Sequence, residues 1–275
     1  MSACKETIEG ILQRNGLNKP DGRHLCMYRC SDGEYQSLID VLSSVVASRY
    51  RLVPGRTDFE AAALSMYASE WWRRSYTAGP WSWSGILQSI GLDPETPRNE
   101  LYEPVRRGLR YWQRRLLIAG ERNVYLVTVA CEGGLPLNLL VRQGDNHVRH
   151  YLRALLREFR VYGGSTVTSF EIASRLGDYL PRILRQKPLF QICGEVIERV
   201  WQLQTEVEGA AKPTDELDRR HPAWRESFPM VVPDDVACAL LNSLVNEAVK
   251  IARIQELLCA TSIVRGGRGT SSSAR

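Results

Sequence analysis

Apolar residues recur every three or four positions in segment after segment of this 275-residue chain. Between residues 34 and 50, for example, Tyr35, Leu38, Ile39 and Leu42 fall on one face of a helix. This periodicity predicts a mainly α-helical protein, a helical bundle-like assembly with one or two short β-strands. The expected helices cover residues 5–14, 34–50, 58–72, 84–90, 101–117, 145–161, 168–177, 187–207 and 234–258.

One segment departs from the helical spacing. Residues 123–130 are rich in β-branched side chains, and this composition predicts a strand. The Glu132-Gly133-Gly134 sequence after it is expected to form a turn. A phosphate-binding loop can follow a strand in this way, but the lysine of such loops is missing, so an ordinary turn is favoured.

Composition and turn signals divide the chain into regions. We expect an N-terminal helical region with a tryptophan-rich segment, a central arginine-rich region, a C-terminal helical region and a disordered tail. No stretch contains the roughly 18 consecutive apolar residues of a membrane span, and the N-terminus does not resemble a secretory signal. The sequence therefore favours a soluble cytoplasmic protein. The expected regions are 1–120, 121–208, 209–260 and 261–275.

The positive charge of the chain is concentrated in its middle. The formal net charge is +5, yet residues 98–187 hold 16 arginines and lysines against 8 acidic residues, and all but one of those cations are arginine. A spacing of about four residues places several of these arginines in rows on two predicted helix faces. One row is Arg106, Arg110 and Arg114, and the other is Arg149, Arg153, Arg157 and Arg160.

Three interpretations of the rows remain open. They could contact nucleic-acid phosphates or an acidic protein, since arginine binds both groups in a bidentate manner. They could also be a solvated outer face with a few intrahelical ion pairs. Only Glu158 offers a carboxylate beside the second row, which favours phosphate contact. Such binding to DNA would be non-specific, because nothing in the pattern would read bases.

Four of the seven tryptophans lie within thirteen residues, and a Gly-Pro sequence separates them into two pairs. Tryptophans usually anchor a core, and that interpretation is favoured. The alternative is a stacking platform for single-stranded nucleic acid, with Arg73 and Arg74 beside the rings. A peptide-binding groove is a third interpretation. The four tryptophans are Trp71, Trp72, Trp81 and Trp83.

No complete catalytic motif is recognisable, so we expect no catalytic residue. Cys26 and Cys30 have no second cysteine pair, and His147 and His150 have no third ligand, so we predict neither a metal site nor a cofactor. The seven scattered cysteines are expected to be reduced thiols. A nuclease stays a less favoured alternative, since folding could assemble carboxylates that are distant in sequence.

Two motifs carry a family resemblance over about residues 20–255. The chain resembles the N-terminal region of a family of large proteins from bacterial genomic islands, associated with Druantia-type anti-phage defence. The resemblance implies a helicase partner encoded nearby and assigns no catalytic residues. Because family members are far longer, the chain is expected to be a truncated form. The motifs are Glu70-Trp71-Trp72-Arg73-Arg74 with Gly79-Pro80-Trp81-Ser82-Trp83, and Tyr125-Leu126-Val127-Thr128-Val129-Ala130-Cys131-Glu132-Gly133-Gly134-Leu135-Pro136.

The charge pattern and the resemblance together predict a non-catalytic module of an anti-phage defence system. We expect it to contact DNA through its arginine-lined helices and to dock a helicase. The alternative is a protein-interaction scaffold that binds no nucleic acid, with the tryptophan segment and the last helix as partner surfaces.

Overall fold

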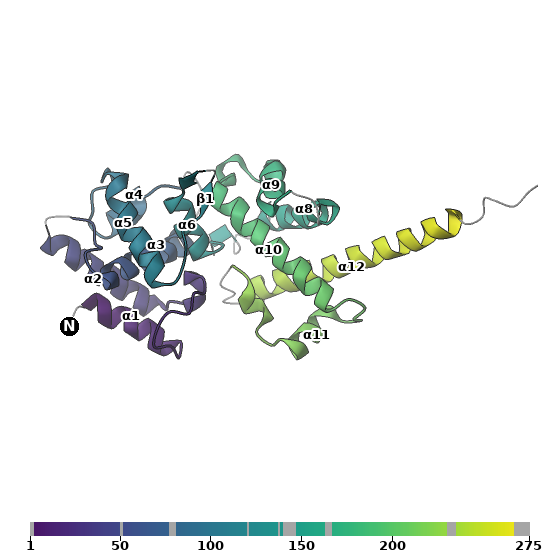
Figure 1. Cartoon of the computed structure of the whole chain (residues 1–275), viewed down its shortest axis with the longest axis horizontal. Helices are drawn as coiled ribbons and strands as arrows, with labels where there is room; N and C mark the ends of the chain where they lie inside the picture. The colour runs from purple at the N-terminus through teal and green to yellow at the C-terminus, as the bar shows by residue number, and fades with distance from the viewer. Residues whose placement is uncertain are drawn as a thin grey trace, which may run out of the picture.

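The computed structural model is mainly α-helical, as predicted, with helices packed directly on helices (Figure 1). Its β-structure within the described residues is one antiparallel ribbon of two short strands, β1 (Ile118–Ala119) and β2 (Arg122–Asn123). No described helix combines the length and apolarity required to cross a bilayer. The structure describes residues 3–49, 52–76, 81–119, 121–136, 138–139, 147–162, 167–229 and 235–266.

Helix α3 (Asp58–Ser75) is the centre of the first half of the chain. Thr57 begins it, because the Thr57 side chain accepts a hydrogen bond from the Glu60 backbone N–H. Almost every residue from Glu60 to Glu70 is buried, as expected for a helix that neighbours enclose on all sides. The helices packed against α3 are α1 (Ala3–Arg14), α2 (Asp32–Ser48), α5 (Arg98–Tyr111) and α6 (Tyr125–Gly133).

Helix α10 (Lys187–Glu206) has the same central position in the second half. Its apolar face is buried, including Ile192, Val196 and Val200. Helices α8 (His147–Tyr162), α9 (Ser169–Arg175) and α12 (Asp235–Gly266) pack against it, and α11 (Pro213–Arg220) packs against α12. The shorter elements are η1 (Leu25–Tyr28), α4 (Ser84–Ser89), η2 (Leu176–Tyr179), η3 (Arg182–Leu184) and η4 (Trp224–Ser227).

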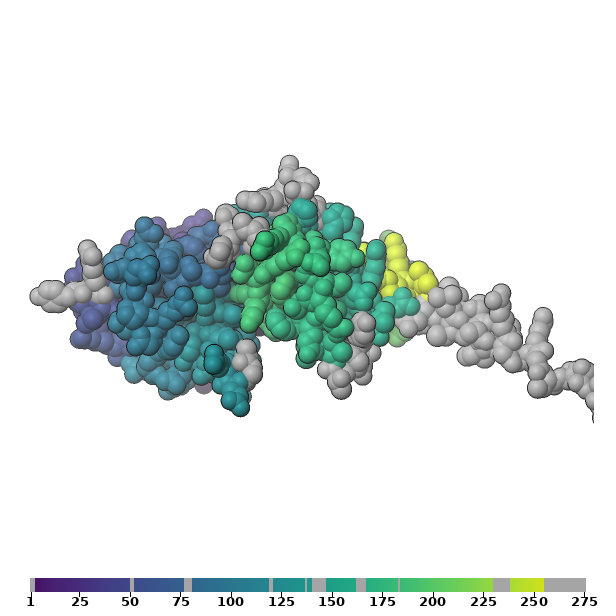
Figure 2. All heavy atoms as spheres, turned by 90° about the horizontal axis from the view of Figure 1, so that it is seen from above, coloured from purple at the N-terminus to yellow at the C-terminus, as the bar shows by residue number. Residues whose placement is uncertain are grey.

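The two halves have separate hydrophobic clusters that meet at α6. Val129 belongs to the cluster around α3, whereas Ala130 and Cys131 belong to the cluster around α10. Figure 2 shows the N-terminal residues, purple to blue, and the green residues of α10 in one continuous body. The far end of α12 extends beyond the other helices (Figure 1).

The strand predicted at 123–130 is wrong, because residues 125–133 form α6. One side of this segment packs on α3 and another on α10, and this packing outweighs the β-propensity of its branched side chains. Thr128 adapts to the helix, since its hydroxyl donates a 2.8 Å hydrogen bond to the Val124 carbonyl. The predicted turn is shifted as a consequence: Glu132 is helical, and Gly134, with φ of 72°, follows the helix.

Three other boundaries differ from the prediction. Helix α5 stops at Tyr111 rather than 117, where Gln113 adopts a left-handed conformation with φ of 58°. Helix α11 lies between the helices predicted at 187–207 and 234–258, where no helix was predicted, with Pro213 in its first turn. Helix α12 runs on to Gly266, and residues 267–275 of the expected tail lie outside the described residues.

Candidate nucleic-acid interface

One of the two predicted arginine rows lies entirely on helix α8. Its apolar side is fully buried, as shown by Leu152 and Leu155. On the other side, Arg157 is 67% exposed and Arg153 is 36% exposed. Arg149 is half-buried and makes no ion pair with a described residue. Arg160 ends the row, and its side chain is also only partly exposed.

A carboxylate that sequence reasoning missed lies against this row. Glu247, on α12, is 2.9 Å from Arg157 Nη2 and 3.3 Å from Arg153 Nε. Arg153 also donates from Nη2 to the Ser243 hydroxyl at 3.1 Å. No local sequence pattern signals the pairing, because 90 residues separate Arg157 from Glu247. Two guanidinium groups therefore share one carboxylate, which leaves the pair of helices with an excess of positive charge.

The Arg153 guanidinium is incompletely satisfied. Although Arg153 Nε is close to Glu247, the contact lacks hydrogen-bond geometry, and this buried N–H has no acceptor among the described residues. A buried donor without an acceptor is costly, so Glu247 satisfies the Arg153 guanidinium only in part.

A cavity of about 390 Å³ opens beside the same arginines. Arg153 and Arg157 line it together with His150 and Glu158 from α8, and with Tyr179 from η2. Tyr179 is 57% exposed. Guanidinium groups beside an exposed aromatic ring can hold a phosphate and stack on a base or sugar. Within the described part of the chain, no cluster of three or more His, Cys, Asp or Glu side chains could hold a metal ion.

Arg73 and Arg74 do not form part of such a surface. Arg73 is 4% exposed and pairs with Glu70, which is itself fully buried. Arg74 donates to Glu70 at 2.8 Å, pairs with Asp32 at the start of α2, and lies 4.9 Å from the centre of the Tyr35 ring. Arg74 therefore joins α3 to α2, Arg73 is buried in its pair with Glu70, and neither guanidinium is available as a free phosphate contact.

The row predicted on the α5 segment is broken. Arg114 follows the end of α5 and pairs with Glu132 of α6, at 2.8 Å between Nε and Oε1. Arg106 pairs with Glu103 on the surface. Arg110 is exposed and has no ion pair with a described residue. The expected face of three is therefore reduced to Arg106 and Arg110.

The tryptophans pack mainly inside the molecule. Trp72 is fully buried and its indole N–H donates to the Gly134 carbonyl at 2.7 Å, while Trp83 is 6% exposed. Trp81 is half-buried, with its ring centre 4.7 Å from that of Trp72 and 5.7 Å from that of Trp71. This is the arrangement of core anchors. The Gly79-Pro80 sequence between the pairs lies outside the described residues.

A polar cluster joins the two hydrophobic clusters near α6. Glu132 is 3% exposed and accepts from Arg114 and from the Leu25 backbone N–H, at 2.8 and 3.2 Å. His24 Nδ1 is 3.5 Å from the same carboxylate. Glu195 of α10 lies close enough to interact electrostatically with Glu132 and accepts a 2.9 Å hydrogen bond from Gln191.

Glu195→Gln is expected to raise the melting temperature at neutral pH. Burial raises the pKa of Glu195, and the charges of Glu132 and Glu198 raise it further, against the opposing effects of Gln191 and His24. The wild-type protein therefore loses stability as pH rises from the unfolded-state pKa of about 4.3 through the higher folded-state pKa. Glutamine mimics the protonated carboxyl and avoids that loss.

Thermal denaturation of both proteins from about pH 4 to about pH 8 measures this effect. The difference in melting temperature between the two proteins should be near zero at the acid end of this range. It should grow as Glu195 ionises and then level off. Titrating groups that do not interact with Glu195 act equally on both proteins. A pH-independent difference would contradict the assignment.

Comparison with known proteins agrees with this two-part organisation. Residues 1–135 match the family model described as the YjiT N-terminal domain, and residues 143–257 match the YjiT second domain. Protein YjiT of Escherichia coli (strain K12) is 27% identical over 248 residues, which cover 88% of this chain and 46% of YjiT. The chain thus spans about half the length of this curated relative. No solved structure matches the chain. Since the two domain models cover most of its residues, the chain belongs to the YjiT family.

Proposed function

We propose that this chain is a non-catalytic module that binds the phosphate backbone of DNA through the α8 face, defined as Arg149, Arg153, Arg157 and Arg160. The observation that carries the proposal is the sharing of Glu247 by two arginines, which leaves cationic charge unbalanced beside an open cavity. A phosphate can replace some of the contacts that Glu247 makes with Arg153 and Arg157, because guanidinium binds phosphate and carboxylate in the same bidentate manner.

Binding of this kind does not distinguish base sequences. The cations lie on one outer helix face, and contacts to phosphates fix position without reading base edges. We therefore expect affinity to depend on salt far more than on sequence, with a log–log slope of about −0.9 for each phosphate neutralised on duplex DNA.

The wider role that we propose is in an anti-phage defence system, where the chain docks a helicase. The resemblance of its two motifs to proteins of Druantia-type loci supports this part of the proposal. The projecting end of α12 is the element best placed to reach a partner (Figure 1). Helicase pull-down that survives nuclease treatment would support direct docking, and its loss would indicate that DNA bridges the two proteins.

Charge reversal on α8 is expected to abolish most DNA binding. Arg149→Glu combined with Arg157→Glu should weaken binding about 100-fold at low salt and reduce the salt slope by about two. Arg153 is left in place because it also joins α8 to Ser243 of α12. Fluorescence anisotropy of labelled duplex DNA, measured over a range of salt concentrations, gives both quantities.

The matched control is Arg106→Glu with Arg110→Glu, which changes the net charge equally on the exposed side of α5. This control should bind nearly as well as the wild type. Equal loss in both variants would show that binding follows net charge rather than the α8 face. If the wild-type protein does not bind DNA at low salt, the proposal of DNA binding fails and the scaffold alternative is favoured.

Glu247→Gln should act in the opposite direction. It removes the carboxylate that competes with phosphate for Arg153 and Arg157, so affinity is expected to rise about three- to tenfold. Circular dichroism would verify that α8 and α12 remain folded. Unchanged or weaker binding by the folded variant would argue against phosphate contact at this position.

A further inference from the structure

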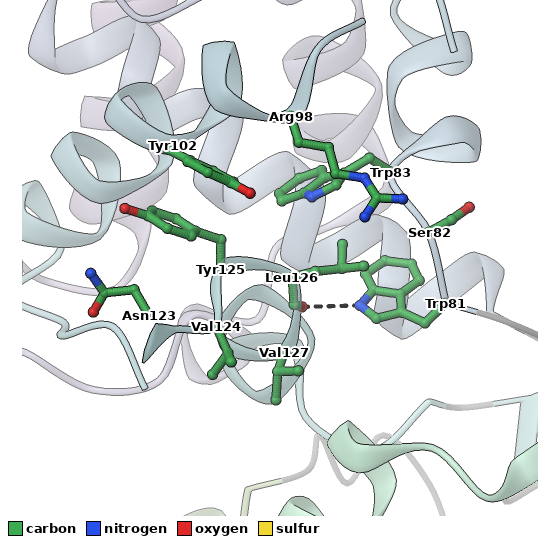
Figure 3. Close-up of a pocket in the computed structure, with 10 residues that line it drawn as sticks. All are labelled: Trp81, Ser82, Trp83, Arg98, Tyr102, Asn123, Val124, Tyr125, Leu126 and Val127. Carbon is green, nitrogen blue, oxygen red and sulfur yellow. Dashed lines mark hydrogen bonds between the residues drawn. The ribbon is translucent and has the colours of Figure 1, made fainter. Parts of the chain in front are cut away.

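A second cavity, about 240 Å³ in volume, is lined by residues of α5, of α6 and the segment before it, and of the end of the tryptophan segment (Figure 3). It is smaller than the roughly 300–1,000 Å³ of pockets for drug-sized ligands, which suits a ligand with a single aromatic unit. The residues important for its chemistry are Trp81, Trp83, Arg98, Tyr102, Asn123 and Tyr125.

The aromatic walls of this cavity are held in place. Tyr102 of α5 and Tyr125 of α6 stack with ring centres 4.2 Å apart and ring planes at 9°. Tyr102 is 39% exposed, so the stack continues to the surface. The Trp81 indole N–H donates to the Leu126 carbonyl at 3.0 Å, which fixes the orientation of that ring (Figure 3). A planar ligand could therefore stack without first ordering the side chains that receive it.

The polar groups of the cavity have a definite charge. Arg98, exposed at the start of α5, makes no ion pair with a described residue, and its guanidinium reaches toward Trp81 and Trp83 (Figure 3). Among the residues that the structure describes, no carboxylate lines the cavity. The Asn123 amide, which supplies both a donor and an acceptor, lies at the edge of the cavity beyond the Tyr125 ring (Figure 3). The cavity thus combines aromatic faces, the cation of Arg98 and an amide that both donates and accepts hydrogen bonds. This combination favours a planar, heteroaromatic and anionic ligand.

We infer that this cavity binds one nucleotide, with its base against the tyrosine and tryptophan rings and its phosphate on Arg98. The inference goes beyond phosphate binding by α8, because it assigns a site that recognises a base. The same chemistry is present in a free nucleoside monophosphate and in the terminal nucleotide of a single strand.

Isothermal titration calorimetry of the full chain with dAMP tests the inference directly. For a ligand of this size, a Kd on the order of 100 µM is expected. Quenching of intrinsic tryptophan fluorescence by dAMP would support a base near a tryptophan ring, as Trp81 and Trp83 require. Binding of inorganic phosphate with equal affinity, or absence of dAMP binding, would overturn the inference.

Three variants locate the ligand. Tyr102→Ala should weaken dAMP binding about tenfold through lost stacking. Arg98→Gln should remove the preference for dAMP over deoxyadenosine. The matched control is Ile254→Ala, which removes an exposed apolar side chain of α12 that lines neither cavity and should leave dAMP binding unchanged. Equal effects of Tyr102→Ala and Ile254→Ala would overturn the assignment.

The source of the nucleotide is resolved by titrating dAMP against a short 5′-phosphorylated single strand. Equal affinity identifies a free mononucleotide as sufficient, whereas much tighter strand binding identifies a strand end, and both support the site. A failure of nucleotide binding in this cavity can be distinguished from a failure of the proposed function. Duplex DNA binding depends on α8 and is expected to be insensitive to Tyr102→Ala.

Discussion

Gly108→Ala is expected to destabilise the protein by about 3 kcal/mol, although alanine is the better helix former. A Cβ atom at this position of α5 would lie 2.1 Å from both the Ala61 carbonyl oxygen and the Ser65 hydroxyl oxygen of α3. The carbonyl belongs to the backbone of the most enclosed helix, so it cannot move aside without disturbing its neighbours. Gly133 of α6 makes the same kind of approach, at 2.3 Å from the Ser69 carbonyl oxygen.

Gly10→Ala is the matched control for this prediction. Gly10 also lies within a helix, α1, but its side is exposed and an added Cβ would meet nothing within 4 Å. That substitution should therefore stabilise the protein, by about 0.5–1 kcal/mol. Urea denaturation of the two variants measures both free energies. Stabilisation by both would mean that α5 does not approach α3 as closely as described.

Glu132→Ala is the second substitution with a large expected effect, a loss of about 3 kcal/mol or more. Glu132 is the buried acceptor for Arg114 and for the Leu25 backbone N–H. Its removal leaves a guanidinium that is only 23% exposed without its counterion, and a buried N–H without its acceptor. Since these partners come from α6, from the segment after α5 and from η1, the loss should loosen the junction of the two hydrophobic clusters.

Glu226→Ala provides the comparison for an exposed ion pair. Glu226 pairs with Arg29 at 2.9 Å, but both side chains are about half exposed, so the expected loss is below about 1 kcal/mol. Chemical denaturation measures the free energy of unfolding of both variants. A third variant, which combines Glu132→Ala with Arg114→Met, distinguishes the loss of the ion pair from the cost of leaving Arg114 unpaired. The double variant should recover part of the loss, because it no longer buries an unpaired charge. Similar losses in Glu132→Ala and Glu226→Ala would contradict the buried position of Glu132.

The helices of this protein could largely be predicted from local sequence. Helix α8, for instance, follows from apolar and basic residues that alternate with a period near 3.6, and the α3 start follows from Thr57 and acidic residues in the first turn. Such signals extend over three or four residues, so they do not depend on the rest of the chain. The arginine row on α8 is visible in the sequence for the same reason.

The candidate sites depended on contacts between distant segments, which local patterns do not encode. Residues 125–133 have strand composition, yet packing between α3 and α10 makes them helical and places Glu132 beside Arg114. The balance of charge on α8 depends on Glu247, 90 residues after Arg157. The pocket proposed for a nucleotide exists because α5 and α6 bring Tyr102 and Tyr125 together. Burial and pairing are properties of the assembled core, so the sequence predicted which helices form, and only the packing of those helices fixed which side chains remain available for binding.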